Sequence, residues 1–212
     1  AQGFGGMIGN KRACSFGDIS TTSFFPAKPL GCYGDGGAVF TDNDEWAALA
    51  DSYRVHGKGM FKYDNVRIGM NSRLDTLQAA ILKIKFKAFR EYELRDINKA
   101  AALYTKLLAG RVKTPVTPEG YYSSWAQYTI CLNSREERDA LQACLKEQGI
   151  PSMVYYPTPM HGQTAYKALN APTDCCSTAK RLCDTVLSLP VHPYITEEEI
   201  ETVCSVILGF VR

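Results

Sequence analysis

A lysine in an apolar segment beside a cluster of glycines is the residue of this sequence best suited to covalent chemistry. Lys28 lies in the segment 24–30, FFPAKPL, and the turn Gly34-Asp35-Gly36-Gly37 follows it. Apolar surroundings disfavour the charged ammonium form of a lysine, and the neutral amine is the form that attacks an aldehyde. Ser23 could donate a hydrogen bond to a phosphate, and the glycines would let a planar ligand approach the backbone. On spacing alone, a surface lysine in a loop is the simpler interpretation.

The elements around this lysine are expected to be short strands followed by two helices. Residues 1–41 are glycine-rich and strand-like, with a short strand that ends at Thr41. The run Asp42-Asn43-Asp44 offers N-caps for a helix over Glu45–Arg54, and residues 58–72 are expected to form a loop.

A long helix is predicted after this loop, with a pattern that continues to about Leu108, before Gly110. Its apolar stripe, at three- and four-residue steps, is Leu74, Leu77, Ile81, Ile84 and Ala88. We interpret this stripe as core or as an interface, and the helix as a connection between domains or a support for a subunit interface.

The second half of the sequence predicts a compact α/β lobe. Strands are expected at Ala126–Leu132 and Val186–Leu189, and a helix at about Asp174–Thr185. Two further helices are predicted from capping-box patterns, which are Ser134 with Glu137 and Thr196 with Glu199. Residues 150–172 form a predicted loop with four prolines.

Composition is that of an ordinary soluble globular protein. The 212 residues are 45% apolar and 22% charged, and the net charge is +2, which argues against a nucleic acid or an anionic membrane as partner. No apolar run approaches the roughly 18–20 residues that span a bilayer. No signal peptide is visible, so we expect a cytoplasmic protein. The eight cysteines form no C-x-x-C pair and there are three histidines, so we expect reduced thiols and no metal site.

Ser23, Lys28 and the glycine turn resemble the active-site lysine motif of the DegT/DnrJ/EryC1/StrS sugar aminotransferases, S-F-x-x-x-K followed by G-[ED]-G-G. Other matches follow in the family's order along nearly the whole chain. They are Gly17-Asp18-Ile19, Arg54-Val55-His56-Gly57, Gly69-Met70-Asn71-Ser72-Arg73-Leu74, Tyr155-Tyr156-Pro157, Met160-His161-Gly162-Gln163, Ala165-Tyr166 and Leu187-Ser188-Leu189-Pro190-Val191-His192-Pro193.

The resemblance implies the fold: an α/β protein, the C-terminal part of a pyridoxal-phosphate-dependent transferase of fold type I, like aspartate aminotransferase. Residues 1–72 would be the remainder of the large cofactor-binding domain, which contains the lysine. Residues 73–110 would be the long connecting helix, and residues 111–212 the small C-terminal α/β domain.

The resemblance also implies roles for individual residues. Lys28 would be the catalytic residue that binds pyridoxal 5′-phosphate covalently and later moves a proton. Ser23 would bind the cofactor phosphate, and Gln2 would lie close to the cofactor ring. Asn71 would reach the phosphate of the neighbouring subunit's cofactor, which implies a homodimer. The residues implied to contact the substrate are Arg73, His161 and Tyr166.

The implied substrate is a nucleotide-linked keto-sugar. The stretch Ala27–Ala38, with Tyr63–Arg67, is most similar to the subgroup that aminates the C3 keto group of a UDP-linked N-acetylated keto-sugar acid. Glutamate would be the amino donor, and the product would enter bacterial surface polysaccharide such as O-antigen. A dTDP-linked keto-sugar is the main alternative. Lys28 argues against the dehydratase branch of the family, which has histidine there.

The sequence departs from the family's pattern at its start. The family pairs the cofactor ring nitrogen with the Asp of an E-D-x-A-Q segment; if Gln2 matches its last residue, that Asp would precede Ala1. The family's Gly-Thr phosphate turn and ring-stacking aromatic also lie earlier, and a full member is considerably longer. A truncated, inactive fragment that acts only in folding or dimerisation is therefore the alternative function. A cofactor-free enzyme that uses Lys28 as nucleophile is a third hypothesis.

Overall fold

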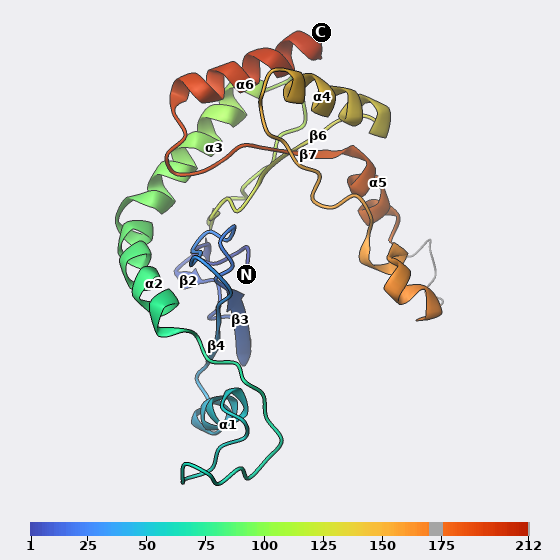
Figure 1. Ribbon diagram of the computed structural model, residues 1–212. Helices are drawn as coiled ribbons and strands as arrows, with labels where there is room; N and C mark the ends of the chain where they lie inside the picture. The colour runs from blue at the N-terminus through green and yellow to red at the C-terminus, as the bar shows by residue number, and fades with distance from the viewer. Residues whose placement is uncertain (170–175, 212) are drawn as a thin grey trace. The chain divides into compact units, whose positions relative to one another are not determined.

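The computed structural model describes residues 1–169 and 176–211, which form two compact units (Figure 1). The first unit consists of Ala1–Arg95 and Thr117–Ala126. The second consists of Asp96–Val116 and Gln127–Arg212. The chain thus returns to the first unit once before it completes the second.

The first unit contains two small antiparallel sheets. One sheet has the order β2-β1-β5 and consists of β1 (Met7–Ile8), β2 (Lys11–Arg12) and β5 (Tyr121–Tyr122). The other consists of β3 (Ile19–Ser23) and β4 (Gly37–Thr41), in a register that pairs Ser23 with Gly37. Because a two-stranded sheet is marginally stable on its own, β3 and β4 depend on the segments that pack against them.

Helix α1 (Asp44–Arg54) follows β4 and contacts it. Its N-cap is Asn43, whose side chain accepts a hydrogen bond from the backbone N–H of Trp46 at 3.0 Å. Asp44 and Glu45 add negative charge in the first turn, where the helix dipole favours it. The predicted helix is confirmed and begins one residue earlier than expected.

The long predicted helix is also confirmed, in three consecutive parts. These are α2 (Thr76–Ala88), a π-helical turn (Phe89–Glu93) and α3 (Leu94–Leu108). The helix passes from the first unit into the second between Arg95 and Asp96.

The predicted apolar stripe is not the face of α2 that packs in this chain. Leu77 and Ile84 are 71% and 76% exposed. The packed face carries Leu82 and Phe89 instead, which are buried and seven residues apart on one side of the helix. The interpretation of Leu77 and Ile84 as core is therefore wrong for the described chain, and their role in an interface stays a prediction.

The core of the first unit forms around the segment between β3 and β4. Its buried residues are Phe24, Leu30, Cys32, Leu82, Phe89 and Leu94, with Phe4, Ala38 and Tyr122 packed against them. The ring of Phe4 stacks on Phe89 at a centroid distance of 5.9 Å and meets the edge of Phe24 at 6.2 Å. This core fixes both sides of the segment that contains Lys28.

The second unit is a small α/β lobe, as predicted. Strand β6 (Tyr128–Cys131) pairs antiparallel with β7 (Val186–Leu189). Helix α4 (Arg135–Glu147) contacts β7 as well as α5 (Ser177–Thr185) and α6 (Glu197–Phe210) (Figure 1). The largest fully buried side chains here are Tyr104, Leu108, Tyr128, Ile130, Leu141, Leu145, Leu187, Ile200, Ile207 and Cys204.

The two predicted capping boxes differ in detail. At α6 the box is complete: the Glu199 carboxylate accepts from the Thr196 N–H at 2.8 Å, and the Thr196 hydroxyl accepts from the Glu199 N–H at 3.1 Å. At α4 Ser134 caps the helix, but the Glu137 carboxylate accepts from the N–H of Asn133 instead. Glu137 therefore reaches one residue past the N-cap.

The remaining expectations concern the thiols, the α5 helix and membranes. Every cysteine in the described part of the chain is a free thiol. Helix α5 begins at Ser177; the predicted start at Asp174, and Cys175, lie outside the described residues. Within residues 1–169 and 176–211, no helix is both long and apolar enough to cross a membrane.

Candidate active site

Lys28 lies in the loop 24–36, here called the Lys28 loop, which connects β3 to β4. The backbone closes this loop: Cys32 N–H donates to the carbonyl of Phe24 and Phe24 N–H donates to the carbonyl of Gly36, both at 2.7 Å. Inside it, Lys28 N–H donates to the carbonyl of Phe25 at 2.9 Å. Lys28 is half-buried. The lysine is therefore held on a hydrogen-bonded loop, not on a loose surface segment.

Ser23 is the last residue of β3 and immediately precedes this loop. Its Oγ accepts a hydrogen bond from the N–H of Phe25 at 3.2 Å, so the hydroxyl proton can still be donated to another acceptor. Ser23 is half-buried, like Lys28. One short segment thus provides both an amine and a hydroxyl donor.

Two glycines of the turn are packed too closely for a side chain. A Cβ on Gly36 would lie 2.9 Å from Leu74 Cδ1, and one on Gly37 would lie 2.8 Å from the carbonyl oxygen of Thr22. Close packing of the chain on itself, rather than ligand approach, accounts for these two glycines.

Asn71 lies on a segment that is held against the end of α1 by backbone hydrogen bonds. Met70 N–H donates to the backbone carbonyl of Tyr53 at 2.8 Å, and Ser72 N–H donates to the backbone carbonyl of Arg54 at 2.9 Å. Asn71 itself is exposed. The segment is therefore fixed while the Asn71 side chain remains accessible.

Arg73, two residues further on, is paired with a histidine. Its guanidinium lies 3.3 Å from Nε2 of His56, which can accept the bond in the tautomer protonated at Nδ1. His56 has a positive φ of 60°, unusual for a residue with a side chain. The His56 N–H donates to the carbonyl of Met70, and the Asn65 side-chain amide donates to the carbonyl of His56. These two hydrogen bonds give His56 a structural role.

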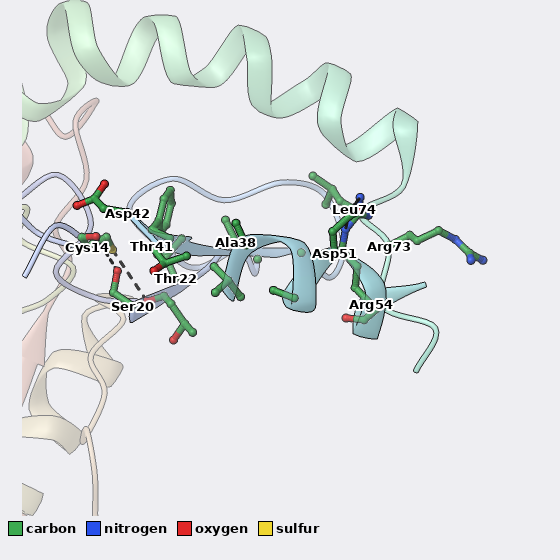
Figure 2. A pocket seen from close by; sticks show the side chains of 18 of the residues that line it. Cys14, Ser20, Thr22, Ala38, Thr41, Asp42, Asp51, Arg54, Arg73 and Leu74 are labelled. Atoms are coloured by element: carbon green, nitrogen blue, oxygen red, sulfur yellow. Dashed lines mark hydrogen bonds and ion pairs between the residues drawn. The ribbon is translucent and has the colours of Figure 1, made fainter. Parts of the chain in front are cut away.

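An open pocket of about 1150 Å³ lies in the first unit, along β3, β4, α1 and residues 71–74 (Figure 2). Asp42 and Cys14 lie at one end of the view and Arg73 at the other. Asn71 and Arg73 line this pocket, whereas Lys28 and Ser23 do not. Thr22 also lines it, and its buried hydroxyl has no hydrogen-bond partner among the described residues. The structure therefore places Asn71 and Arg73 at this pocket, whereas Lys28 and Ser23 lie in and beside the Lys28 loop.

The other predicted residues are in the second unit or near the start of the chain. His161 and Tyr166 belong to the second unit, where they lie in consecutive 3₁₀ helices, Met160–Gly162 and Thr164–Leu169. His161 is half-buried and Tyr166 exposed. Gln2 is exposed in the first unit, and its carbonyl accepts from the Ser124 hydroxyl at 2.9 Å.

The model of the DegT/DnrJ/EryC1/StrS aminotransferase family matches residues 1–208 of the chain. The chain belongs to this aminotransferase family. It is 41% identical to a UDP-2-acetamido-2-deoxy-3-oxo-D-glucuronate aminotransferase of Pseudomonas aeruginosa, over 97% of this chain and 55% of that protein. It is 34% identical to a dTDP-3-amino-3,4,6-trideoxy-alpha-D-glucose transaminase of Streptomyces venezuelae, over 92% of this chain and 51% of that protein.

Solved structures agree with this assignment and with the expected fold. A DegT/DnrJ/EryC1/StrS aminotransferase from Brucella abortus has a TM-score of 0.94 and 45% identity, over all of this chain and 56% of that one. A Bacillus subtilis protein with bound cofactor PMP has a TM-score of 0.85 and 28% identity, over 94% of this chain and 47% of that one. The chain spans about half the length of the relatives it matches.

Pyridoxal phosphate is the cofactor of this aminotransferase family, and the residues described here fit it in part. In a site for this cofactor, Lys28 would supply the amine and Ser23 the hydroxyl for the phosphate, and both residues are half-buried on a hydrogen-bonded segment. Gln78 and Cys32, which the sequence analysis did not single out, support this loop through side-chain bonds. The sequence alone does not mark Gln78, because a polar residue on the helix face of Leu82 and Phe89 forms no pattern that indicates a contact with the loop.

Proposed function

We propose that this chain is the lysine-bearing part of an aminotransferase that uses pyridoxal phosphate and acts on a UDP-linked 3-keto-N-acetylated hexuronic acid. The observation that carries the proposal is the Lys28 loop, which follows Ser23 directly and holds the half-buried Lys28 on a hydrogen-bonded segment. The match over 97% of the chain to an aminotransferase of that substrate class supports it.

In this proposal each residue has a defined task. Lys28 would hold the cofactor through its amine and would move a proton at the reacting carbon. Ser23 donates its hydroxyl proton to the cofactor phosphate, and Gln2 lies near the ring. When bound, the cofactor supplies an electron sink for the carbon that loses a proton.

The substrate groups need residues from both units. Arg73 offers a cation to the acid or diphosphate of the sugar nucleotide, because its side chain is exposed at the open pocket. His161 and Tyr166 offer a hydrogen-bonding ring and a hydroxyl on an exposed helical segment. We propose glutamate as the amino donor, surface polysaccharide as the pathway and the cytoplasm as the location.

A homodimer is part of the proposal. Asn71 is exposed on a fixed segment and lines the open pocket, whose lining does not include Lys28, which suits a residue that serves the site of a neighbouring subunit. The dTDP-linked keto-sugars are the second candidate substrates, favoured by the 34% identity to a dTDP-sugar transaminase.

The alternative is an inactive fragment that acts in folding or pairing. It is favoured by the Thr22 hydroxyl, which lies buried beside the open pocket without a hydrogen-bond partner in the described chain.

The decisive experiment is to trap the cofactor on Lys28. We expect the purified chain with added pyridoxal phosphate to develop a visible absorbance band, and borohydride reduction with peptide mapping to place the adduct on Lys28. Lys28→Ala should lose the band and the adduct, whereas Lys83→Ala, at an exposed lysine on α2, should keep both. A wild-type chain without adduct would favour the inactive fragment.

The substrate class is tested next. UDP- and dTDP-linked 3-keto-sugars, offered at equal concentration to protein loaded with the amino form of the cofactor, should return the absorbance band at different rates. We expect the UDP-linked sugar acid to react faster. Faster return of the band with the dTDP-linked sugar would assign the chain to the second substrate class.

A further inference from the structure

The Lys28 loop is tied to helix α2 by the side chain of Gln78. The Oε1 atom of Gln78 accepts a hydrogen bond from the backbone N–H of Tyr33 at 2.8 Å. A Cβ on Gly34 would lie 3.1 Å from Gln78 Nε2, so the side-chain amide lies directly against the backbone of the turn. The tether therefore holds the part of the loop that follows the lysine.

Contacts inside the loop connect this tether to Lys28. Cys32 is fully buried, and its Sγ lies 3.0 Å from the carbonyl oxygen of Phe24 and 3.1 Å from that of Gly34. A thiol has one proton and donates to one of these carbonyls at a time. A Cβ on Gly31 would lie 2.5 Å from the carbonyl oxygen of Pro26, so the two sides of the loop are in close contact. These contacts connect the side of the loop that carries Tyr33 to the side that carries Lys28.

The surface of α2 that meets the loop is continuous. Gln78, Leu82 and Lys85 lie on one helix face at spacings of four and three residues. Leu82 is buried in the same core as Leu30 and Cys32, and Lys85 Nζ lies over the Tyr33 ring at 5.5 Å from its centroid. Gln78 is the residue of this face whose side chain bonds the loop backbone.

We propose that Gln78 is a positioning residue that holds the Lys28 loop against α2 and thereby sets the place of the Lys28 amine. It acts through the Tyr33 amide and the packed loop and does not itself touch cofactor or substrate. The role rests on the proposed function, because the placement of the amine matters for the reaction with the cofactor aldehyde.

Three variants separate this role from general stability. Gln78→Leu removes the acceptor, Gln78→Glu keeps an oxygen that can accept the Tyr33 N–H, and Lys83→Ala changes an exposed α2 residue on another face. In the chain without cofactor, Gln78→Leu should speed hydrogen exchange of the Tyr33 amide and of the other backbone amides of residues 28 and 30–34 by roughly 3- to 10-fold, as expected for one lost hydrogen bond. Gln78→Glu and Lys83→Ala should exchange like the wild type.

The second measurement is the rate at which pyridoxal phosphate is trapped on Lys28 at a temperature where all variants are folded. Gln78→Leu should react several-fold more slowly and Gln78→Glu at close to the wild-type rate. A wild-type chain that traps the cofactor on Lys28 at the same rate as Gln78→Leu would overturn the positioning role and leave the proposed function intact. A wild-type chain with no adduct on Lys28 would overturn both. Unchanged exchange at Tyr33 in Gln78→Leu would overturn the tether itself.

Discussion

Two buried tyrosines show what the interior of the second unit does to an ionisable side chain. Tyr104 stacks on Tyr128 at a centroid distance of 5.0 Å, and its hydroxyl donates to the carbonyl of Pro190 at 2.9 Å. Burial raises the pKa of Tyr104, and the nearby Cys204, Tyr128 and Glu199 raise it further. Burial likewise raises the pKa of the Cys204 thiol to about 12. The Tyr104 hydroxyl and the Cys204 thiol are therefore neutral at pH 7, and both have a structural role.

The raised pKa of Tyr104 predicts a loss of stability in alkali. A group whose folded pKa is raised contributes its full stability below its unfolded pKa, about 10 for tyrosine, and the contribution falls as pH rises above that value. We expect Tyr104→Phe to lower the free energy of unfolding by about 1 kcal/mol at pH 7, because the Pro190 carbonyl loses its donor. The variant should also lose stability less steeply above about pH 10.

Denaturant unfolding between pH 7 and 11 measures both effects. Tyr63→Phe is the matched control, because Tyr63 is 85% exposed. Equal alkaline slopes for Tyr104→Phe and the wild type would show that Tyr104 ionises alike in both states.

Single residues differ in how far the sequence reveals them. Lys28 and Ser23 stand in a motif that resembles the family's, so their roles are predictions that rest on this resemblance, since spacing alone favours a surface lysine. Gln78 and Cys32 could not be predicted, because their importance comes from backbone carbonyls and amides brought close by the fold. The Gly36 and Gly37 packing contacts were missed for the same reason.

At the scale of elements, the cap of α6 gives the clearest energetic prediction. The Thr196 N–H and hydroxyl both bond the Glu199 carboxylate, and these bonds lower the pKa of Glu199. Thr196→Ala should destabilise the protein by about 1 kcal/mol, the usual effect of losing a helix N-cap. Thermal or urea unfolding at pH 7 measures it, with Glu198→Gln on the same turn as control.

The same cap predicts a dependence on acid. A lowered folded pKa gives stability that is present above the unfolded pKa and is lost as pH falls through the folded pKa. Glu199→Gln cannot ionise, so its stability should fall less between about pH 5 and pH 3 than that of the wild type. If the stability of Glu199→Gln and of the wild type falls equally over this pH range, the hydrogen bond to the Glu199 carboxylate does not contribute to stability.

Elements were predictable where local chemistry decides them. Asn43, Ser134 and Thr196 all cap helices at the expected places, and Gly110 lies just beyond the end of α3. The packed face of α2 was not predictable, because both of its sides carry apolar residues at helical spacing. The Lys28 loop packs on the side of Leu82, and this contact between distant segments selects the face.

At the scale of the whole molecule, several large apolar side chains of the first unit are mostly exposed. Met60 and Ile68 are 90% and 96% exposed, and Leu77 and Ile84 on α2 are 71% and 76% exposed. Hydrogen bonds nevertheless hold the loop around Met60 in place. The Gly59 N–H donates to the backbone carbonyl of Asp64 at 2.6 Å, and the Arg67 guanidinium donates to the Ser52 hydroxyl at 2.6 Å. Ordered, exposed apolar residues of this kind are typical of an interface.

The proposed homodimer predicts that these residues contact a second copy. We expect a concentration-dependent dimer in sedimentation velocity, and we expect Ile84→Glu to shift it toward monomer, because a buried unpaired carboxylate is costly in an interface. Val116→Glu is the control: Val116 is 84% exposed in the second unit, so the same charge is added elsewhere. Since Ile84 is 76% exposed within one chain, its replacement should leave the circular dichroism of the monomer unchanged. Monomer at every concentration, or equal effects of the two variants, would remove α2 from the subunit interface and leave its exposed stripe to a different partner.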